Sequence, residues 1–256
     1  VAEALSLLDE AEELMTDHSN PQEEWWTYLH RDRSAALSWL NTDMARLYVQ
    51  KLRESARPGI GYYCEARIAL GVGEEPKQVD AALSIVESAH DKHVELSVPL
   101  VLFHLSLLRR HATKRFDFAR QENLYLDLEK MSNSPQRPID RYRHAVTCYQ
   151  IGKCREGEER FRRLREEFRK TGGAQFIARD FWRDSHNPEK PRLTQIRVNR
   201  IVTEWRADGY VEELGHDVPL RPRHFSPVPK LNDPVSCVIR FGPNGPLAVP
   251  SRFEGA

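Results

Sequence analysis

The sequence has no excess of charge of either sign. Its 256 residues include 38 Lys and Arg residues and 38 Asp and Glu residues, so the formal net charge at neutral pH is zero. A chain without net charge has no overall positive field that would attract polyanions. Any binding of nucleic acid must therefore rest on a local group of basic residues.

Cysteine is scarce and dispersed. The four cysteines, Cys64, Cys148, Cys154 and Cys237, contain no Cys-x-x-Cys pair. The sequence therefore offers neither a disulfide framework nor the spacing of a zinc ribbon. Unpaired thiols fit a reducing compartment, and we predict a cytoplasmic protein.

Long apolar runs and leader sequences are also missing. No apolar segment approaches the roughly 18 residues that a membrane-spanning helix needs. The first residues lack the basic and then apolar order of a signal peptide, so we expect no membrane partner. Because the chain begins at Val1 within an amphipathic pattern, we expect it to be part of a longer protein whose catalytic part, if any, lies outside this sequence.

Motifs that cradle phosphate or expose a nucleophile do not occur. The sequence has no Gly-x-x-x-x-Gly-Lys, Gly-x-Gly-x-x-Gly or Gly-x-Ser-x-Gly, the spacings that serve these purposes in known enzyme classes. We therefore predict a protein that is not an enzyme, with no catalytic residue, no metal ligand and no cofactor.

Residues 1–179 have the pattern of amphipathic helices. Apolar residues recur at steps of three and four, and Ala, Leu, Glu and Arg are abundant. Pro, Gly and Asn predict breaks at residues 17–21, 57–61, 71–76, 96–99, 114–117, 132–138, 152 and 171–173. Short turns between helices of this length predict antiparallel helix pairs.

The clearest helix pair lies at residues 141–164. Small and apolar residues fall where two helices would touch, namely Ala145, Cys148, Gly157, Phe161 and Leu164, with Gly152 in the turn. This unit resembles a tetratricopeptide repeat, in which about 34 residues form helix, turn and helix. Earlier pairs at 62–89 and 98–130 follow a looser period of roughly 40. The resemblance implies a superhelical array of helix pairs with a groove that binds a protein or peptide.

An aromatic cluster near the N-terminus has two interpretations. Trp25, Trp26, Tyr28 and Trp39 could form a platform for a ligand. The helical spacing of Trp25 and Tyr28 favours packing against the next helix instead.

Two pairs of residues have a chemical interpretation and a structural one. His90 and His93, three residues apart, could bind a metal, although a solvated helix face explains them equally simply. His144 and Cys148, one helical turn apart, are formally a base and a nucleophile. The repeat pattern instead predicts that Cys148 is a buried and inert side chain.

The segment 155–170 is the densest in basic residues. Glutamates interleave with the arginines, and Glu158 with Arg162 and Glu159 with Arg163 are spaced for i to i+4 ion pairs. We predict a helix whose charges are paired within it. The alternative is an edge that contacts phosphate, which would require residues such as Arg163 to be free of carboxylates.

The C-terminal residues 194–256 show a strand pattern. Residues 235–249 indicate two strands joined by a Gly-Pro-Asn-Gly-Pro turn, and earlier strands fall at 196–202, 209–211 and 217–225. This arrangement resembles a cold-shock domain, which implies a small five-stranded antiparallel OB-type barrel and single-stranded nucleic acid as a ligand. Residues 180–193, rich in Pro and charge, are predicted to be a linker, with Phe181 and Trp182 as candidate anchors against the last helices. The predicted fold class is mainly α with a C-terminal all-β part.

The resemblance also suggests binding residues. Cold-shock domains stack bases on aromatic side chains of two adjacent strands and contact the backbone with basic residues. On the first strand this sequence keeps Tyr210 beside a glycine, where the ring could either pack in the barrel wall or stack on a base. On the second, it has Val-Pro-Leu-Arg-Pro at 218–222 where the family has Val-Phe-Val-His-Phe. The predicted nucleic-acid contacts are Trp205, Tyr210, Arg221, Arg223 and Arg240.

These observations leave three functions open. The first is a non-catalytic recognition module whose helical groove binds protein and whose barrel binds single-stranded RNA or DNA. The second is a protein-interaction or ligand-sensing C-terminal portion of a larger signalling or defence protein, with the barrel as a structural cap on the repeats. A third is an enzyme with a site around His90, His93 and His104.

Overall fold

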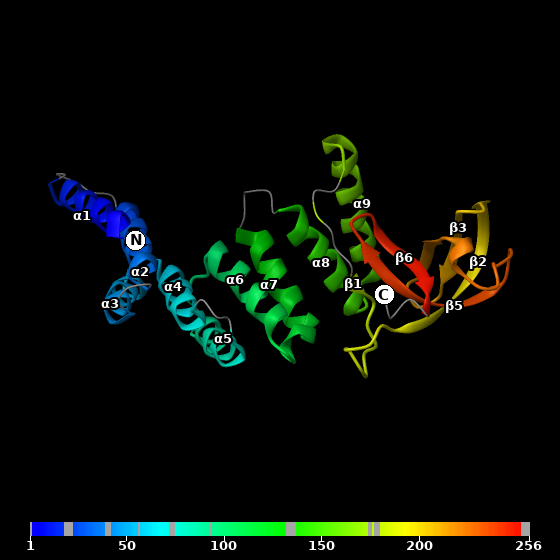
Figure 1. The fold of residues 1–256 in the computed structure, drawn as a ribbon, viewed down its shortest axis with the longest axis horizontal. Coiled ribbons are helices and arrows are strands. Elements are labelled where there is room, and N and C mark those ends of the chain that lie inside the picture. Colours follow the sequence, from blue (N-terminus) through cyan, green and yellow to red (C-terminus); the bar gives the residue numbers. More distant parts are fainter. Residues whose placement is uncertain are drawn as a thin grey trace. The chain divides into compact units, whose positions relative to one another are not determined.

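The structure is a computed structural model that describes residues 2–17, 23–38, 42–55, 57–71, 75–92, 94–131, 137–173, 176 and 180–251. These residues form a mainly helical chain that ends in a barrel, as the sequence predicts (Figure 1). The chain divides into two compact units. We call residues 1–117 with 124–133 the helical unit, and residues 118–123 with 134–256 the barrel unit.

Most of the described helices begin at or just after the breaks that the sequence predicts. They are α1 (Ala2–Asp17), α2 (Glu23–Leu37), α3 (Thr42–Arg53), α4 (Pro58–Leu70), α5 (Pro76–Asp91), α6 (Val98–Arg110), the 3-10 turn η1 (Lys114–Phe116), α7 (Phe118–Met131), α8 (Pro138–Gln150) and α9 (Cys154–Thr171). A proline lies in the first turn of α4, α5, α6 and α8, where its fixed φ suits the helix and no N–H is needed. The sequence pattern misses the break between α2 and α3, because residues 38–41 contain neither Gly nor Pro.

In the helical unit, consecutive helices from α1 to α6 pack on one another, and α4 also contacts α2 and α6. Its main core contains fully buried Leu83, Leu100, Leu105 and Tyr125. Packing between sequence neighbours is typical of helical repeats. The superhelical arrangement of these helices stays a prediction.

The aromatic residues of α2 do not pack as predicted. Trp25 is 40% exposed and Tyr28 is 42% exposed, whereas Leu29 is buried. The reason is the orientation of α2, which turns Arg33 into the structure, where its guanidinium bonds to Asp9 of α1 at 2.5 Å. Tyr28 is therefore left at the surface. Trp39 lies outside the described residues.

The barrel unit contains the strands β1 (Asp180–Phe181), β2 (Leu193–Thr203), β3 (Arg206–Val211), β4 (His216–Leu220), β5 (Pro234–Gly242) and β6 (Gly245–Pro250), with the 3-10 turn η2 (Pro222–His224) after β4. The strands pair in the order β5-β2-β3-β4-β6, and β6 returns to β5 and closes the barrel. This order is compatible with an OB fold. Strand β1 is an additional strand on β5.

The prediction of a wholly antiparallel barrel is wrong at one pair of strands. β4 and β6 are parallel and meet at Leu220 and Ala248. The reason is geometric. β2, β3 and β4 alternate in direction, β5 is antiparallel to β2, and β6 is antiparallel to β5. The last strand must therefore run in the same direction as β4 when the barrel closes.

Helices α8 and α9 share one core with the barrel. The ring of Phe161 on α9 stacks on that of Phe241 on β5, with centroids 6.1 Å apart and an interplanar angle of 8°. The hydroxyl of Tyr142 on α8 donates to Asp180 at 2.9 Å and lies 3.1 Å from the carbonyl oxygen of Phe241. The predicted helix pair therefore buries its apolar seam against the barrel, and the residues expected at the contact are buried: Ala145, Cys148, Gly157, Phe161 and Leu164.

The segment predicted as a linker, 180–193, is packed where the structure describes it. Trp182 belongs to the core of the barrel unit. The side-chain amide of Gln150 on α8 donates to the carbonyl of Phe181 at 2.7 Å and accepts from the backbone N–H of Arg183 at 3.0 Å. Both residues suggested as anchors, Phe181 and Trp182, therefore make contacts within the barrel unit.

Candidate nucleic-acid interface

Strands β2, β3 and β4 expose a continuous outer surface, which we call the open face. Alternation along β3 buries Ala207 and Val211 in the barrel and turns Tyr210 outward, 45% exposed. The open face consists of Arg197, Arg200, Trp205, Arg206, Asp208, Tyr210, Asp217, Pro219 and Arg221.

Tyr210 lies at the centre of a row across three strands. Arg197 of β2 and Asp217 of β4 are its direct partners in the sheet register. Asp217 also accepts a hydrogen bond from the amide of Asn199 at 2.6 Å. The neighbouring Gly209 has to lack a side chain, because a Cβ there would lie 2.5 Å from Cγ1 of Ile196. The strand therefore packs closely on the core while Tyr210 is presented to solvent.

Trp205 lies in the turn between β2 and β3 and is 54% exposed. The guanidinium of Arg223 lies 4.3 Å from the centroid of its ring and forms an ion pair with Glu204. The structure thus brings two of the predicted contact residues together. One ring face of Trp205 is engaged by this cation–π contact.

Four arginines of the open face, Arg197, Arg200, Arg206 and Arg221, are exposed. In the part of the chain that the structure describes, none of the four forms an ion pair. Their guanidinium groups are therefore available to an anionic ligand.

The open face lacks the predicted contact residue Arg240, and β4 adds no aromatic side chain to it. Arg240 is half-buried on β5, paired with Phe181 of β1 and Leu247 of β6, so the strand register does not bring it to the open face. The outward residues of β4 are Asp217 and Pro219. As the sequence indicates, this strand therefore supplies no second aromatic ring.

The turn between β5 and β6 is occupied by the protein itself. The guanidinium of Arg165 on α9 donates to the carbonyl oxygen of Asn244 at 3.0 Å. Arg165 also lies beside Gly245, where an added Cβ would come within 3.0 Å of it. In OB folds the corresponding loop is one of the regions that contact ligand. In this protein α9 covers it.

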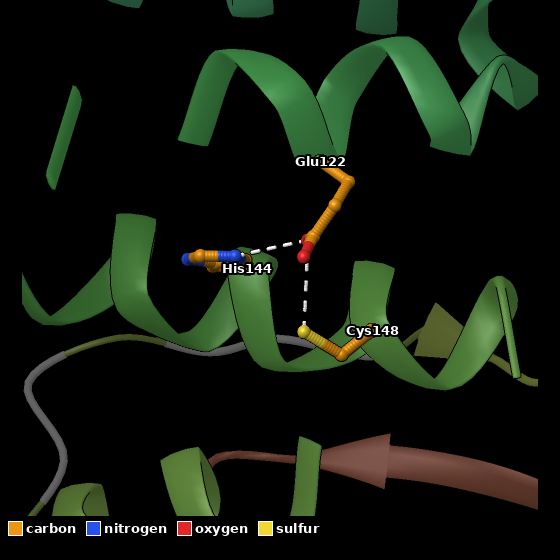
Figure 2. Close-up of side chains that lie close together, drawn as sticks. All are labelled: Glu122, His144 and Cys148. Carbon is orange, nitrogen blue, oxygen red and sulfur yellow. Dashed lines mark hydrogen bonds and ion pairs between the residues drawn. The ribbon is translucent and has the colours of Figure 1, made fainter. Parts of the chain in front are cut away.

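A cluster of polar and ionisable side chains lies inside the barrel unit (Figure 2). Glu122 of α7 points between His144 and Cys148 of α8, and all three are buried. One carboxylate oxygen of Glu122 lies 2.9 Å from Nε2 of His144 and accepts a hydrogen bond from the thiol of Cys148 at 3.6 Å. The other oxygen lies 3.2 Å from Nζ of Lys153.

Within this group, Glu122 is an ionised carboxylate paired with His144 and Lys153. Burial alone would raise the pKa of Glu122, but hydrogen bonds and charge from His144 and Lys153 lower the pKa to about 2. Burial and the adjacent Glu122 raise the pKa of the Cys148 thiol to about 12. Nucleophiles and metal ligands require the thiolate. The arrangement therefore fits a structural role, in which Glu122 of α7 is held by an ion pair and a hydrogen bond to α8. This agrees with the prediction that Cys148 is buried and inert.

The histidines considered as an alternative site lie in the helical unit. His90 of α5 and the buried His104 of α6 are neighbours, with ring centroids 5.0 Å apart. His93 lies outside the described residues. Among the residues that the structure describes, neither His90 nor His104 belongs to a group of three metal-ligating side chains.

The arginine-rich helix α9 pairs many of its own charges. Arg163 bonds to Glu159 at 3.0 Å, as predicted. The predicted pair of Glu158 with Arg162 does not form, because Arg162 bonds to Glu159 at 2.8 Å while Glu158 turns to Arg165 at 2.5 Å. A phosphate-contacting edge that uses Arg163 is therefore not favoured.

The helical unit contains a cleft of about 930 Å³ between α2, α4 and the start of α6. Tyr28 and Arg31 of α2, Tyr63 and Arg67 of α4, and Leu96 before α6 line it. Sequence reasoning placed a binding groove in the helices and considered Tyr28 as part of a ligand platform, but it did not identify the other lining residues. Whether these residues line a cleft depends on which faces of α2 and α4 meet. The apolar periodicity of α2 does not reveal which face that is.

Comparison of the chain with protein-family models, with curated proteins and with solved structures finds no match. No helix in the described ranges is long and apolar enough to cross a bilayer.

Proposed function

We propose that this protein is a non-catalytic recognition module whose barrel binds single-stranded nucleic acid at the open face. The observation that carries the proposal is the exposed ring of Tyr210 on a barrel compatible with an OB fold, surrounded by arginines that form no ion pair with the described residues. Exposed aromatic rings beside basic groups are the usual means by which such barrels bind single strands.

In this proposal, Trp205 and Tyr210 each stack on one base. Trp205 precedes Tyr210 by five residues, which corresponds to roughly 16 Å along an extended strand at about 3.3 Å per residue. A base stacked on each ring would contribute about 1–3 kcal/mol. Arg206 lies on the same strand between the two rings, and Arg221 follows β4. These groups are positioned to contact the phosphates that connect the two bases.

The acidic residues of the open face limit the affinity. Asp208 and Asp217 lie among the arginines, and Glu204 engages Arg223. We therefore expect moderate, salt-sensitive binding, with log K falling by about 0.7 for each phosphate contacted per unit of log salt concentration. The contacts are to phosphate and to ring faces, which both RNA and DNA provide. In the same proposal, the helical unit binds a protein or peptide, and the protein acts in the cytoplasm.

One observation favours the alternative function, in which the barrel is a structural cap in a protein-interaction or sensor portion of a larger protein. The ring of Phe161 on α9 packs on the barrel, and Arg165 holds the turn between β5 and β6. A domain docked so extensively on the last helix pair can shield the end of a helical array from solvent.

Fluorescence anisotropy with short labelled RNA and DNA single strands distinguishes the two functions. We expect saturable binding that weakens between about 50 and 200 mM salt. The double variant Tyr210→Ala, Arg221→Ala should bind at least about tenfold more weakly, because it loses one base stack and one phosphate contact. The matched control is Arg162→Ala, which removes an exposed arginine of α9 that is paired with Glu159.

The control variant should bind like the parent protein. Binding that is equally strong in the double variant would place the interaction elsewhere. If neither nucleic acid binds at tens of micromolar protein, where non-specific binders already register, the barrel has the capping function.

A further inference from the structure

We propose that the cleft of the helical unit binds a small anionic ligand that carries a flat ring, of the nucleoside monophosphate class. This site is separate from the open face of the barrel. It rests on the shape, charge and aromatic lining of one cleft, and it goes beyond the nucleic-acid binding proposed above.

The cleft is hollow because small residues face one another across it. Ser34 and Ala35 of α2 and Ser38 just after it lie opposite α4, and Gly59 of α4 and its C-cap residue Gly71 also line the cleft. The described side chains leave an open space between the two helices. Its volume of about 930 Å³ lies near the upper end of the range of about 300–1,000 Å³ that is common for small-ligand sites.

The close packing at one end of the cleft depends on Gly59. A Cβ there would lie 2.5 Å from the backbone oxygen of Glu95. The first turn of α4 therefore packs directly on the segment that leads into α6. This contact fixes the end wall of the cleft through backbone atoms, so the site is preformed.

The charged groups of the lining favour an anion. Arg31, Arg57 and Arg67 face the cleft together with Asp32 and Glu95, which leaves one net positive charge from three arginines and two acids. Asp32 is already bonded to Arg31 at 2.6 Å. Because a guanidinium binds a phosphate with two parallel hydrogen bonds, this lining suits a phosphate group.

Arg67 is the arginine best placed for this role. It is exposed, its guanidinium lies 5.7 Å from the centroid of the Phe103 ring, and it forms no ion pair with the described residues. The aromatic contact holds the side chain in place without neutralising its charge. A ligand phosphate can therefore bind it without displacing a carboxylate.

Two tyrosines provide surfaces for a ring. Tyr28 is the exposed aromatic of α2 that failed to pack against the next helix, and Tyr63 of α4 is half-buried with its edge against Phe103. Ile60 and Leu96 add apolar lining. Tyrosine combines a ring face with a hydroxyl group, so it can both stack on a base and hydrogen-bond its edge.

The extent of the cleft favours a small ligand over an extended peptide. Its lining runs along α2 and α4, and of α6 it includes the first two residues, Val98 and Pro99. A peptide that follows a helical array would contact successive helices along their length. A single anionic group joined to a single ring matches the arginines and tyrosines gathered at this one position.

The test measures binding of the four nucleoside monophosphates to the whole chain by isothermal titration calorimetry. Adenosine and ribose 5-phosphate serve as half-ligands, since one lacks the anion and the other lacks the ring. We expect at least one monophosphate to bind with a dissociation constant below about 1 mM, and both half-ligands to bind at least about tenfold more weakly.

Three variants locate the site. Arg67→Ala should weaken binding about tenfold. Ala35→Trp should abolish it, because the indole fills the cleft at an exposed position and leaves every charge in place. The matched control is Arg46→Ala, an exposed arginine of α3 that pairs with Asp43 outside the cleft and whose loss should have no effect.

The barrel variant Tyr210→Ala separates this proposal from the previous one. Monophosphate binding that survives Tyr210→Ala and is lost in Ala35→Trp supports the cleft, whatever happens to single-stranded nucleic acid. The proposal is overturned if no monophosphate binds below about 1 mM, if Ala35→Trp binds normally, or if Tyr210→Ala abolishes binding. It is also overturned if an acidic peptide, and no monophosphate, binds in a manner that Ala35→Trp blocks.

Discussion

On the side of the barrel that α8 and α9 cover, Tyr142 and Tyr149 are buried, whereas on the open face Tyr210 is 45% exposed. The hydroxyl of Tyr142 bonds to Asp180, and that of Tyr149 lies 2.8 Å from Nε2 of His216. Burial and a neighbouring carboxylate raise the pKa of both buried phenols. Tyr210 has an arginine and an aspartate as cross-strand neighbours, and its side chain faces solvent.

The difference lies in the surroundings of the residues and not in their type. On the covered side, tyrosines join two layers of one core, where each polar group needs a partner because water cannot reach it. On the open face, the same residue type is held by the pleat of a strand. Three pairs of substitutions, each with one buried and one exposed member, test this contrast.

Removal of an aromatic ring should give the largest contrast. Phe161→Ala deletes a fully buried ring that packs on Phe241, and we expect a loss of about 3–5 kcal/mol in the free energy of unfolding. Trp205→Ala removes a larger but exposed ring, and we expect a loss of at most about 1 kcal/mol. Urea unfolding followed by circular dichroism measures both. Similar losses would mean that α9 does not share a core with the barrel.

Neutralisation of a carboxylate should give the next largest contrast. Glu122→Gln breaks the buried contacts to His144 and Lys153, and we expect a loss of about 3 kcal/mol at pH 7. Its counterpart Glu212→Gln, at an exposed position of the barrel, should change stability by less than about 0.5 kcal/mol.

The effect of Glu122→Gln should also depend on pH. The folded-state pKa of Glu122, about 2, lies below its unfolded value, so its contribution to stability is complete above about pH 5 and is lost as the pH falls toward 2. Unfolding measurements at pH 7, 5 and 3 should therefore show the variant approaching the parent protein. A constant difference across this range would contradict an ionised Glu122.

Removal of a hydroxyl should give the smallest contrast. Tyr142→Phe removes a hydroxyl in the core that donates to half-buried Asp180, and we expect a loss of about 1–2 kcal/mol. Tyr210→Phe keeps the ring and removes a hydroxyl that solvent reaches, so stability should stay within about 0.5 kcal/mol. Thermal unfolding of the two variants in parallel provides the measurement. Base stacking should survive Tyr210→Phe, since the ring face is unchanged.

The barrel was largely predictable from sequence because its signals are local. The strand periodicity at residues 235–249 and the Gly-Pro-Asn-Gly-Pro turn indicate β5 and β6. The sequence left open whether Tyr210 packs in the barrel wall or faces outward, and the structure exposes its ring. Prolines in the first turns of helices mark most helix starts in the same local way. The parallel pairing of β4 with β6 was missed, because it follows from closure of the whole barrel.

The candidate sites were less predictable because they depend on long-range register. Glu122 and His144 are separated by 22 positions, and nothing in the local pattern around Glu122 sets it apart from the other glutamates of the chain. The placement of Arg240 away from the open face follows from the pairing of β5 with β1 and β6. The cleft in the helical unit depends on the rotation of α2 about its axis, which is set by the burial of Arg33. The hydropathy of an arginine does not suggest that it would be buried.

The burial of all four cysteines has a practical consequence for spectroscopy. Burial raises the pKa of every thiol, to about 12 at Cys148 and Cys237, and the same direction holds at Cys64 and Cys154. Thiol reagents that require a thiolate will therefore react slowly with the native chain. A single cysteine introduced on the open face by Asp208→Cys can carry a fluorophore or spin label, and the wild-type sequence already provides the silent background.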